Sequence, residues 1–321
     1  MATAAKSVNS SLFSRFLSNY AILFALIVMC IILSFASDRF FSAQNFMNIM
    51  MQSTTMGIIA VGMTFVIITG GIDLSVGAVL ALSAALGAGV MKAGMPFGVG
   101  ILVMVLLAMG IGAAQGLLVS RIRMPAFIVT LGGMTIARGF TMVYMQGRTI
   151  PGLPKEYQFI GSGYIGPIPV AALILIIVYV IAFYVLQYTT FGRSVYAIGG
   201  NREATELSGI NIKRNEMIVF AISGLTCGLG AMILAARLGS AIPTAGDGLE
   251  MEAIGATVIG GASLAGGRGT IIGTLIGVFI LGILNNGMNL LNVDPFYAGV
   301  VRGSVILIAV FIDTMRKRKE F

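Results

Sequence analysis

The sequence contains no histidine and no tryptophan, and only two cysteines, Cys30 and Cys227. The missing histidines exclude histidine metal ligands and histidine general bases, and two cysteines argue against a disulfide framework. Charged residues make up 10% of the 321 residues, against about 25% in a soluble protein. Because 57% of the residues are hydrophobic, a soluble enzyme, a disordered tail and a nucleic-acid module are excluded. The chain is therefore predicted to be an all-α, polytopic membrane protein.

Ten apolar segments approach the length of about 20 residues that a helix needs to cross about 30 Å of hydrocarbon. They are 20–36, 51–70, 73–91, 97–119, 125–146, 168–188, 215–236, 251–265, 271–291 and 296–313. We expect 20–36 to be an uncleaved first span, because it exceeds the usual core of a signal peptide and nine segments follow it. The short, glycine-interrupted segment 251–265 predicts a broken or re-entrant helix. One transmembrane domain is predicted over residues 1–321.

The positions of lysine and arginine predict the orientation of the chain. With a cytoplasmic N-terminus and ten alternating spans, thirteen of the twenty basic residues fall inside and five outside. The remaining two, Arg138 and Arg302, lie within predicted spans. Both termini are therefore expected in the cytoplasm, and the net charge of +8 is explained by orientation, without a nucleic-acid partner.

The energy source for any transport is expected to lie elsewhere. The phosphate-binding pattern G-x-x-x-x-G-K-[ST] is absent, because none of the six lysines follows a glycine. The acidic residues fall at predicted span ends or in loops, which disfavours a proton- or sodium-coupled carrier, although a sodium site built from backbone stays open. Energy is expected from another subunit or from an ion gradient.

The internal loop 189–214 contains a predicted short helix at about 202–208. Asn201 is a good N-cap, Glu203 suits the positive helix N-terminus, and Gly209 suits the position after the helix. Ala204 and Leu207 share one face. Two interpretations remain open from these residues: the helix docks in a groove of a partner, or it lies at the membrane surface.

Four blocks of this sequence resemble the bacterial sugar-type ATP-binding-cassette permeases, and the ribose permease group in particular. The most specific is Gly-Gly-Ile-Asp-Leu-Ser-Val-Gly over 70–77, within the block 60–77, and it is joined by the blocks 125–131, 199–204 and 263–277. The resemblance covers nearly the whole chain. This chain departs from the usual family pattern at Met251-Glu252 and at Gly255.

The resemblance implies a pair of permease copies, expected as a homodimer, in the bacterial cytoplasmic (inner) membrane. It also implies cytoplasmic ABC ATPase domains that hold ATP and Mg, and an external sugar-binding protein that is periplasmic or lipid-anchored. This chain itself is expected to bind no cofactor and no metal. The residues assigned to ATPase coupling are Asn201, Arg202, Glu203, Ala204, Glu206, Leu207 and Gly209.

Neutral amide and hydroxyl groups are the expected partners of sugar hydroxyls along a transport path. Asn285, Asn289 and Asn292 recur on one predicted helix face, with Asn286 beside them. They line the pathway or form hydrogen bonds between helices. Gln52, Thr54 and Thr55 are similar candidates.

Three charged residues are candidates for structural or gating roles. Arg302 is expected to extend toward the outer surface, whereas the deeper Arg138 has a functional role or clamps neighbouring backbone. Asp73 is expected to cap the helix after it, in preference to acting as a gate. The pairs Gly112–Gly116, Gly224–Gly228 and Gly273–Gly277 predict close helix packing.

Together these observations predict that the chain is the membrane subunit of a monosaccharide importer and that the chain itself performs no covalent chemistry. The alternatives are a secondary sugar carrier that works without ATPases and a membrane scaffold without a transport role.

Overall fold

The computed structural model describes residues 24 and 26–318, and it is mostly helical. After the helix Leu26–Ala36 come α2 (Ala43–Ile68), α3 (Val76–Lys92), α4 (Phe97–Ile122), α5 (Ala126–Met145), α6 (Lys155–Ser162), α7 (Val170–Tyr188), α8 (Thr190–Gly200), α9 (Arg202–Leu207), α10 (Ile212–Leu238), α11 (Leu249–Ile259), α12 (Ile271–Leu290) and α13 (Pro295–Arg318). Two antiparallel strand pairs join β1 (Ile150–Pro151) to β4 (Ser240–Ala241) and β2 (Tyr164–Ile165) to β3 (Ile168–Pro169). The predicted all-α character is confirmed apart from these short strands.

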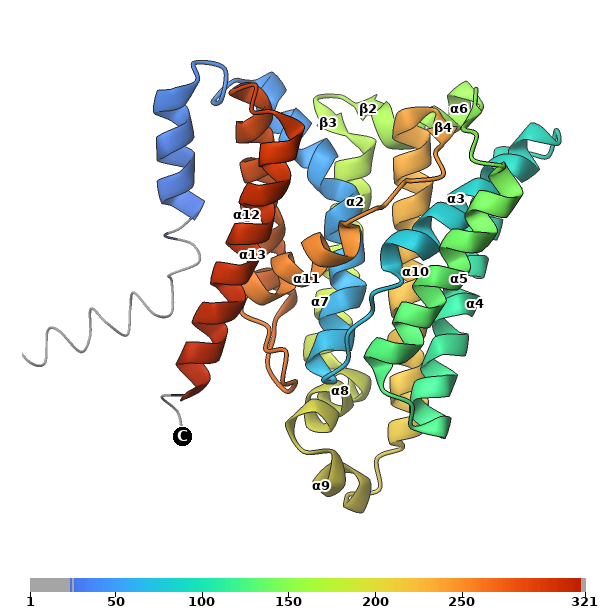
Figure 1. Cartoon of the computed structure of the whole chain (residues 1–321), viewed down its shortest axis with the longest axis vertical. Helices are drawn as coiled ribbons and strands as arrows, with labels where there is room; N and C mark the ends of the chain where they lie inside the picture. Colours follow the sequence, from blue (N-terminus) through green and yellow to red (C-terminus); the bar gives the residue numbers. More distant parts are fainter. Residues whose placement is uncertain (1–23, 25, 319–321) are drawn as a thin grey trace, which may run out of the picture.

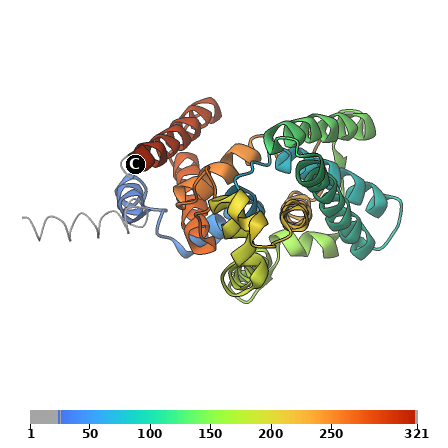
Figure 2. The ribbon, with the colours of Figure 1, turned by 90° about the horizontal axis from the view of Figure 1, so that it is seen from below.

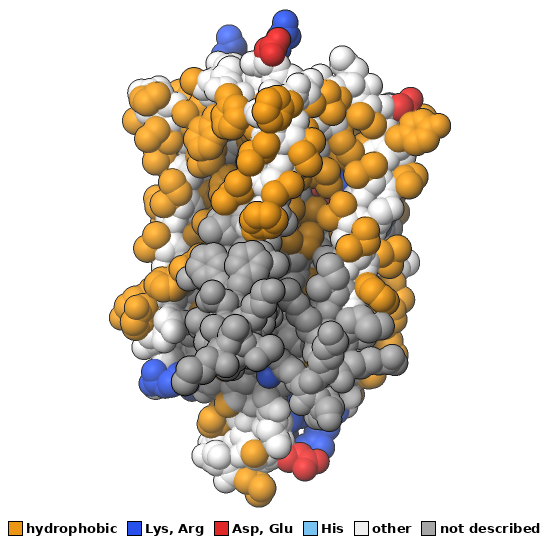
Figure 3. Space-filling view, turned by 90° about the vertical axis from the view of Figure 1, so that its left-hand side faces the viewer, with side chains coloured by type: hydrophobic (Ala, Val, Ile, Leu, Met, Phe, Trp, Pro, Cys, Tyr) orange, Lys and Arg blue, Asp and Glu red, His pale blue; other side chains and the backbone are white. Residues whose placement is uncertain are grey.

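The helices are those of a multi-pass membrane protein. Among the described residues, six helices are long and apolar enough to span a membrane: α2, α4, α5, α7, α10 and α12. Shorter apolar helices are Leu26–Ala36, Val76–Lys92 and Phe296–Ile308. On the face in Figure 3, described charged side chains lie mainly at the two ends, with orange hydrophobic side chains between them. The predicted count of ten spans and the cytoplasmic termini stay predictions, and residues 1–23, 25 and 319–321 lie outside the described part.

The molecule has two opposite ends, which we name the α6 end and the α9 end after the helices found there (Figure 1). α2, α7 and α10 form a central group, with α3, α4 and α5 on one side and α11, α12 and α13 on the other (Figure 2). α10 packs most extensively on α4 and α2. α2 is almost wholly buried, whereas α4 and α5 leave most of their surface exposed. This difference distinguishes a helix enclosed by protein from helices that face lipid.

Two helices begin inside the bundle and are shorter than the six long apolar helices: α3 has 17 residues and α11 has 11. α2 ends beside Gly70, whose φ of 82° reverses the chain, and an irregular segment then leads to α3 at Val76. α10 ends at Gly239 with a φ of 61°, and a second irregular segment leads to α11. The 11 residues of α11 rise only about 16 Å. The predicted broken helix within 251–265 is confirmed, because the helix stops at Ile259.

Three glycine pairs permit two close helix contacts, α4 with α10 and α12 with α11. A Cβ at Gly112 or Gly116 of α4 would collide with the backbone of α10, and a Cβ at Gly224 or Gly228 of α10 would collide with that of α4. In the same way, Gly273 and Gly277 of α12 contact the end of α11. The predicted packing role of all three glycine pairs is confirmed.

Gly112 and Gly110 offer a matched pair of substitutions on α4. Gly112→Ala places a methyl group against the Phe220 carbonyl oxygen and the backbone of Gly224, whereas nothing lies within 4 Å of a Cβ at Gly110. We expect Gly112→Ala to lower the free energy of unfolding by about 2 kcal/mol through overpacking. Gly110→Ala should leave it unchanged or slightly higher. Thermal unfolding in detergent measures both, and equal midpoints for the two variants would contradict the close contact.

Candidate coupling helix and polar cavity

The predicted helix in the loop 189–214 is present as α9, Arg202–Leu207. The Asn201 side chain accepts a hydrogen bond of 2.9 Å from the Ala204 N–H, and Gly209 follows the helix with a φ of 78°. Both predicted boundary residues are therefore confirmed. Leu207 is 90% exposed at the tip of the molecule, and Glu203, Ala204 and Glu206 are exposed beside it. The helix presents an apolar side chain that no described residue covers.

An ion pair ties α9 to the bundle. The Arg202 guanidinium donates two hydrogen bonds to the Glu216 carboxylate of α10, the second at 3.0 Å. Hydrogen bonding to Glu216 raises the pKa of Arg202 above its ordinary value. Glu216 is almost fully buried, so this bidentate pair holds one end of α9 in a fixed position. A weaker, exposed pair joins Glu206 to Arg123 at 3.9 Å.

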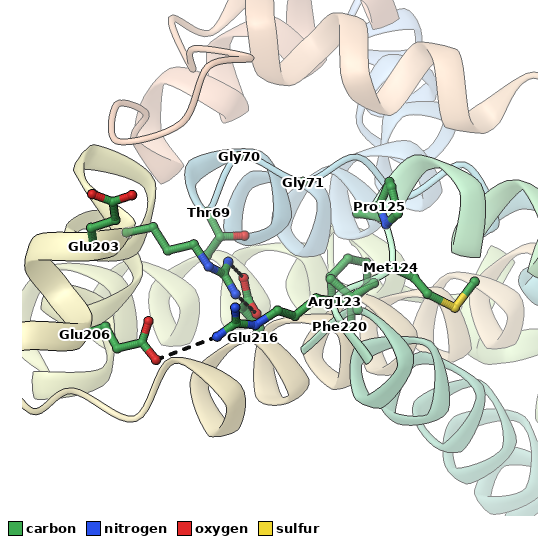
Figure 4. Close-up of a pocket in the computed structure, with 13 residues that line it drawn as sticks. Thr69, Gly70, Gly71, Arg123, Met124, Pro125, Glu203, Glu206, Glu216 and Phe220 are labelled. Carbon is green, nitrogen blue, oxygen red and sulfur yellow. Dashed lines mark hydrogen bonds and ion pairs between the residues drawn. The ribbon is translucent and has the colours of Figure 1, made fainter. Parts of the chain in front are cut away.

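A cavity of about 510 Å³ lies between α9 and the bundle. In Figure 4 the two ion pairs cross it, and Gly70 and Gly71 line its opposite wall. Arg123, Met124 and Pro125 come from the connection between α4 and α5. The cavity therefore lies between α9 and two connections of the bundle, the one after α2 and the one between α4 and α5.

Sequence reasoning missed α8, which joins α9 to the bundle. Thr189 caps it by accepting a hydrogen bond of 3.1 Å from the Gly192 N–H. The Tyr196 hydroxyl donates to the Gly269 carbonyl oxygen at 2.7 Å, and Gly199 packs against the carbonyl oxygen of Ile68. Thr189 was a readable capping signal. α8 thus connects α9 to the end of α2 and to the segment before α12.

A second, polar cavity of about 340 Å³ lies toward the α6 end. Four predicted pathway residues line it together: Gln52 and Thr55 of α2 with Asn285 and Asn289 of α12. Its other lining residues are Ser53, Met56, Leu234, Arg237, Leu249, Glu252, Gly282 and Arg302. Sequence reasoning missed Ser53, Arg237 and Glu252. We name this space the α2–α12 cavity.

Two asparagines of the predicted polar face do not line the α2–α12 cavity. Asn286 is buried and exchanges hydrogen bonds of 2.8 and 3.0 Å with Asn45 of α2, which is the alternative of bonding between helices. The expected position of Asn292 on the helix is wrong, because α12 ends at Leu290 and Asn292 lies in an exposed turn with a φ of 52°.

Both in-span arginines have partners. The expectation that Arg302 extends to the outer surface is wrong, because its Nη1 donates to the Glu252 carboxylate at 2.9 Å. Arg138 donates to the carbonyl oxygens of Pro243 and Ala245 at 2.8 and 3.2 Å and pairs with Asp247. Arg138 thus holds the irregular segment that precedes α11. The sequence contained a signal for the Glu252–Arg302 pair, since the two residues carry opposite charges and both lie in apolar segments.

Asp73 lies inside the bundle, and its expected place at a span end is wrong. It is 2% exposed, and its carboxylate accepts hydrogen bonds from the Ser75 N–H, the Ser75 hydroxyl and the Ser223 hydroxyl at 2.7 to 2.9 Å. The N-cap of α3 is Ser75, so Asp73 does not occupy the predicted capping position. The chain turns back into the protein after Gly70, which places this carboxylate between α4 and α10. Asp73 therefore also corrects the expectation that the acidic residues lie only at span ends or in loops, and Glu252 in the first turn of α11 is partly buried.

Known proteins resemble this chain over nearly its full length. A family model described as branched-chain amino acid transport system / permease component matches residues 45–310. The ribose import permease protein of Bacillus subtilis (strain 168) is 48% identical over 290 residues, or 90% of each chain. The chain belongs to this permease family. The resemblance to sugar-type permeases drawn from the sequence is thereby confirmed.

Other relatives of the permease carry related names. The ribose import permease protein of Escherichia coli (strain K12) is 45% identical over 299 residues, covering 92% of this chain and 93% of that one. The D-allose transport system permease protein of the same organism is 39% identical over 306 residues, or 94% of each chain. No solved structure matches the permease.

Substitutions at Asp73 test its structural role in the permease. Asp73→Ala leaves the Ser75 N–H and the Ser223 hydroxyl without an acceptor, while the Ser75 hydroxyl keeps the Gln115 Oε1 at 3.1 Å. We therefore expect the free energy of unfolding to fall by about 3 kcal/mol. Asp73→Asn keeps an acceptor for the Ser75 N–H and should cost about 1 kcal/mol. Glu156→Gln, an exposed change in α6, is the control. If unfolding in detergent shows that all three variants are equally stable, the network around Asp73 contributes nothing.

Proposed function

We propose that this chain is the membrane-spanning subunit of an ATP-binding-cassette importer for a monosaccharide, ribose or a close relative. An external sugar-binding protein, periplasmic or lipid-anchored, delivers the sugar to the α6 end, and cytoplasmic ABC ATPases dock at the α9 end. The observation that carries the proposal is the capped helix α9 with Leu207 exposed. Identity of 45–48% to ribose import permeases supports the choice of sugar.

In this proposal two copies of the chain form a homodimer in the bacterial cytoplasmic membrane. ATP and Mg are held by the ATPase partner, and this chain binds neither. Closure of the ATPases moves α9, and the Arg202–Glu216 pair and α8 transmit the movement to α10 and α2. The transporter then exchanges one access state for the other. Gln52, Thr55, Asn285 and Asn289 line part of the path of the sugar.

The carboxylates inside the bundle of this chain do not favour the alternative of a secondary sugar carrier. Asp73 is held by hydroxyl and backbone donors, and Glu252 is paired with Arg302. Both groups have fixed structural partners among the described residues, whereas a coupling carboxylate must exchange its proton or cation with water. Family membership and α9 both point to an external ATPase instead.

The exposed face of α9 provides the direct test. Leu207→Asp replaces the apolar tip with a charge, so we expect at least an about tenfold loss of ATPase retained on the purified permease. Insertion into the membrane and the thermal unfolding midpoint should not change, because this side chain is 90% exposed. Lys213→Ala, an exposed change just outside α9, is the control. Normal ATPase retention by Leu207→Asp would refute the assignment of α9.

A further inference from the structure

The α2–α12 cavity contains buried hydroxyl groups without partners. Ser53 is 1% exposed and Thr55 is 3% exposed, and neither hydroxyl has a hydrogen-bond partner among the described residues. Their neighbour Thr54 differs, because its hydroxyl donates to the Met50 carbonyl oxygen at 2.8 Å within α2. Buried polar groups are nearly always hydrogen-bonded in folded proteins. The two free hydroxyls therefore indicate a polar occupant of the cavity.

The opposite walls add further groups with unused hydrogen-bonding capacity. The Asn285 Oδ1 and the Arg302 Nε are buried and have no hydrogen-bond partner among the described residues. Glu252 already bonds the Arg302 Nη1, and Arg237 donates to the Met51 carbonyl oxygen at 3.0 Å. The cavity thus offers one free acceptor, one free charged donor and two hydroxyls that both donate and accept.

This combination suits a neutral polyhydroxylated ligand. Each sugar hydroxyl donates and accepts, so it can bond Asn285 as a donor and Arg302 as an acceptor. The charges of Glu252 and Arg302 compensate one another. The Arg237 guanidinium keeps its positive charge beside the Met51 carbonyl oxygen and can donate further hydrogen bonds to sugar oxygens. Met56 and Leu234 supply an apolar wall for the C–H face of a ring. The volume of about 340 Å³ lies in the range of about 300–1,000 Å³ typical of small-molecule sites.

We propose that the α2–α12 cavity is a binding site for one monosaccharide within each permease chain. Ser53, Thr55 and Asn285 contact its hydroxyls, and Arg302, held by Glu252, donates to a ring or hydroxyl oxygen. The twelve residues that line the cavity belong to one chain. The inference rests on the proposed import function and extends it, because the permease then selects its sugar in addition to the binding protein.

Adjacent threonines of α2 allow a matched test. Thr55→Val removes a free hydroxyl from the cavity, and Thr54→Val removes a hydroxyl that is bonded within the helix. Equilibrium binding of radiolabelled ribose is measured on the purified permease–ATPase complex without the binding protein. We expect Thr55→Val to weaken ribose binding about fivefold and Thr54→Val to leave it unchanged. Ser53→Ala provides a second cavity variant if Thr55→Val fails to fold.

Uptake into liposomes separates the outcomes. If the wild-type complex imports ribose with its binding protein but does not bind ribose alone, the cavity holds only water and the inference is overturned. Equal ribose affinity of Thr55→Val, Ser53→Ala and Thr54→Val overturns it as well. If the wild-type complex neither imports nor binds ribose, the proposed function for this sugar fails together with the site.

Discussion

The contact between Gly77 and Gly246 is the constraint on which the rest of the structure depends. Here the first turn of α3 meets the segment that leads into α11, so closely that a Cβ on either residue would overlap the backbone of the other. Both short helices leave irregular backbone inside the bundle. Because hydrocarbon cannot bond free N–H and C=O groups, such backbone must be enclosed by protein. The burial of α2 and much of α10 follows from this requirement.

The irregular segments before α3 and before α11 also form parts of the two candidate functional regions. Gly70 and Gly71, before α3, line the cavity beneath α9, while Leu249 and Glu252, at the start of α11, line the α2–α12 cavity. Asp73 holds the first irregular segment and Arg138 holds the second. Since the segments touch at Gly77 and Gly246, a continuous set of contacts joins the α9 end to the α2–α12 cavity.

Local features were predictable from the sequence, and features that depend on distant neighbours were not. Asn201 and Gly209 mark α9 correctly because capping depends only on adjacent residues. Hydropathy identified most long helices but could not show that the chain turns inward after Gly70 and buries Asp73. Asn285 and Asn286 are adjacent, yet Asn285 lines the α2–α12 cavity and Asn286 bonds Asn45, because the packing of α12 decides which side faces the cavity. The Glu252–Arg302 pair joins residues 50 positions apart.

The central claim is that this chain transports sugar only when a separate ATPase drives it. Uptake of radiolabelled ribose into liposomes tests this most directly, with the permease reconstituted alone or with its ATPase and its external binding protein. The account predicts accumulation only when ATP, the ATPase and the sugar-loaded binding protein are all present. Accumulation by the permease alone, driven by a proton or sodium gradient, would contradict it.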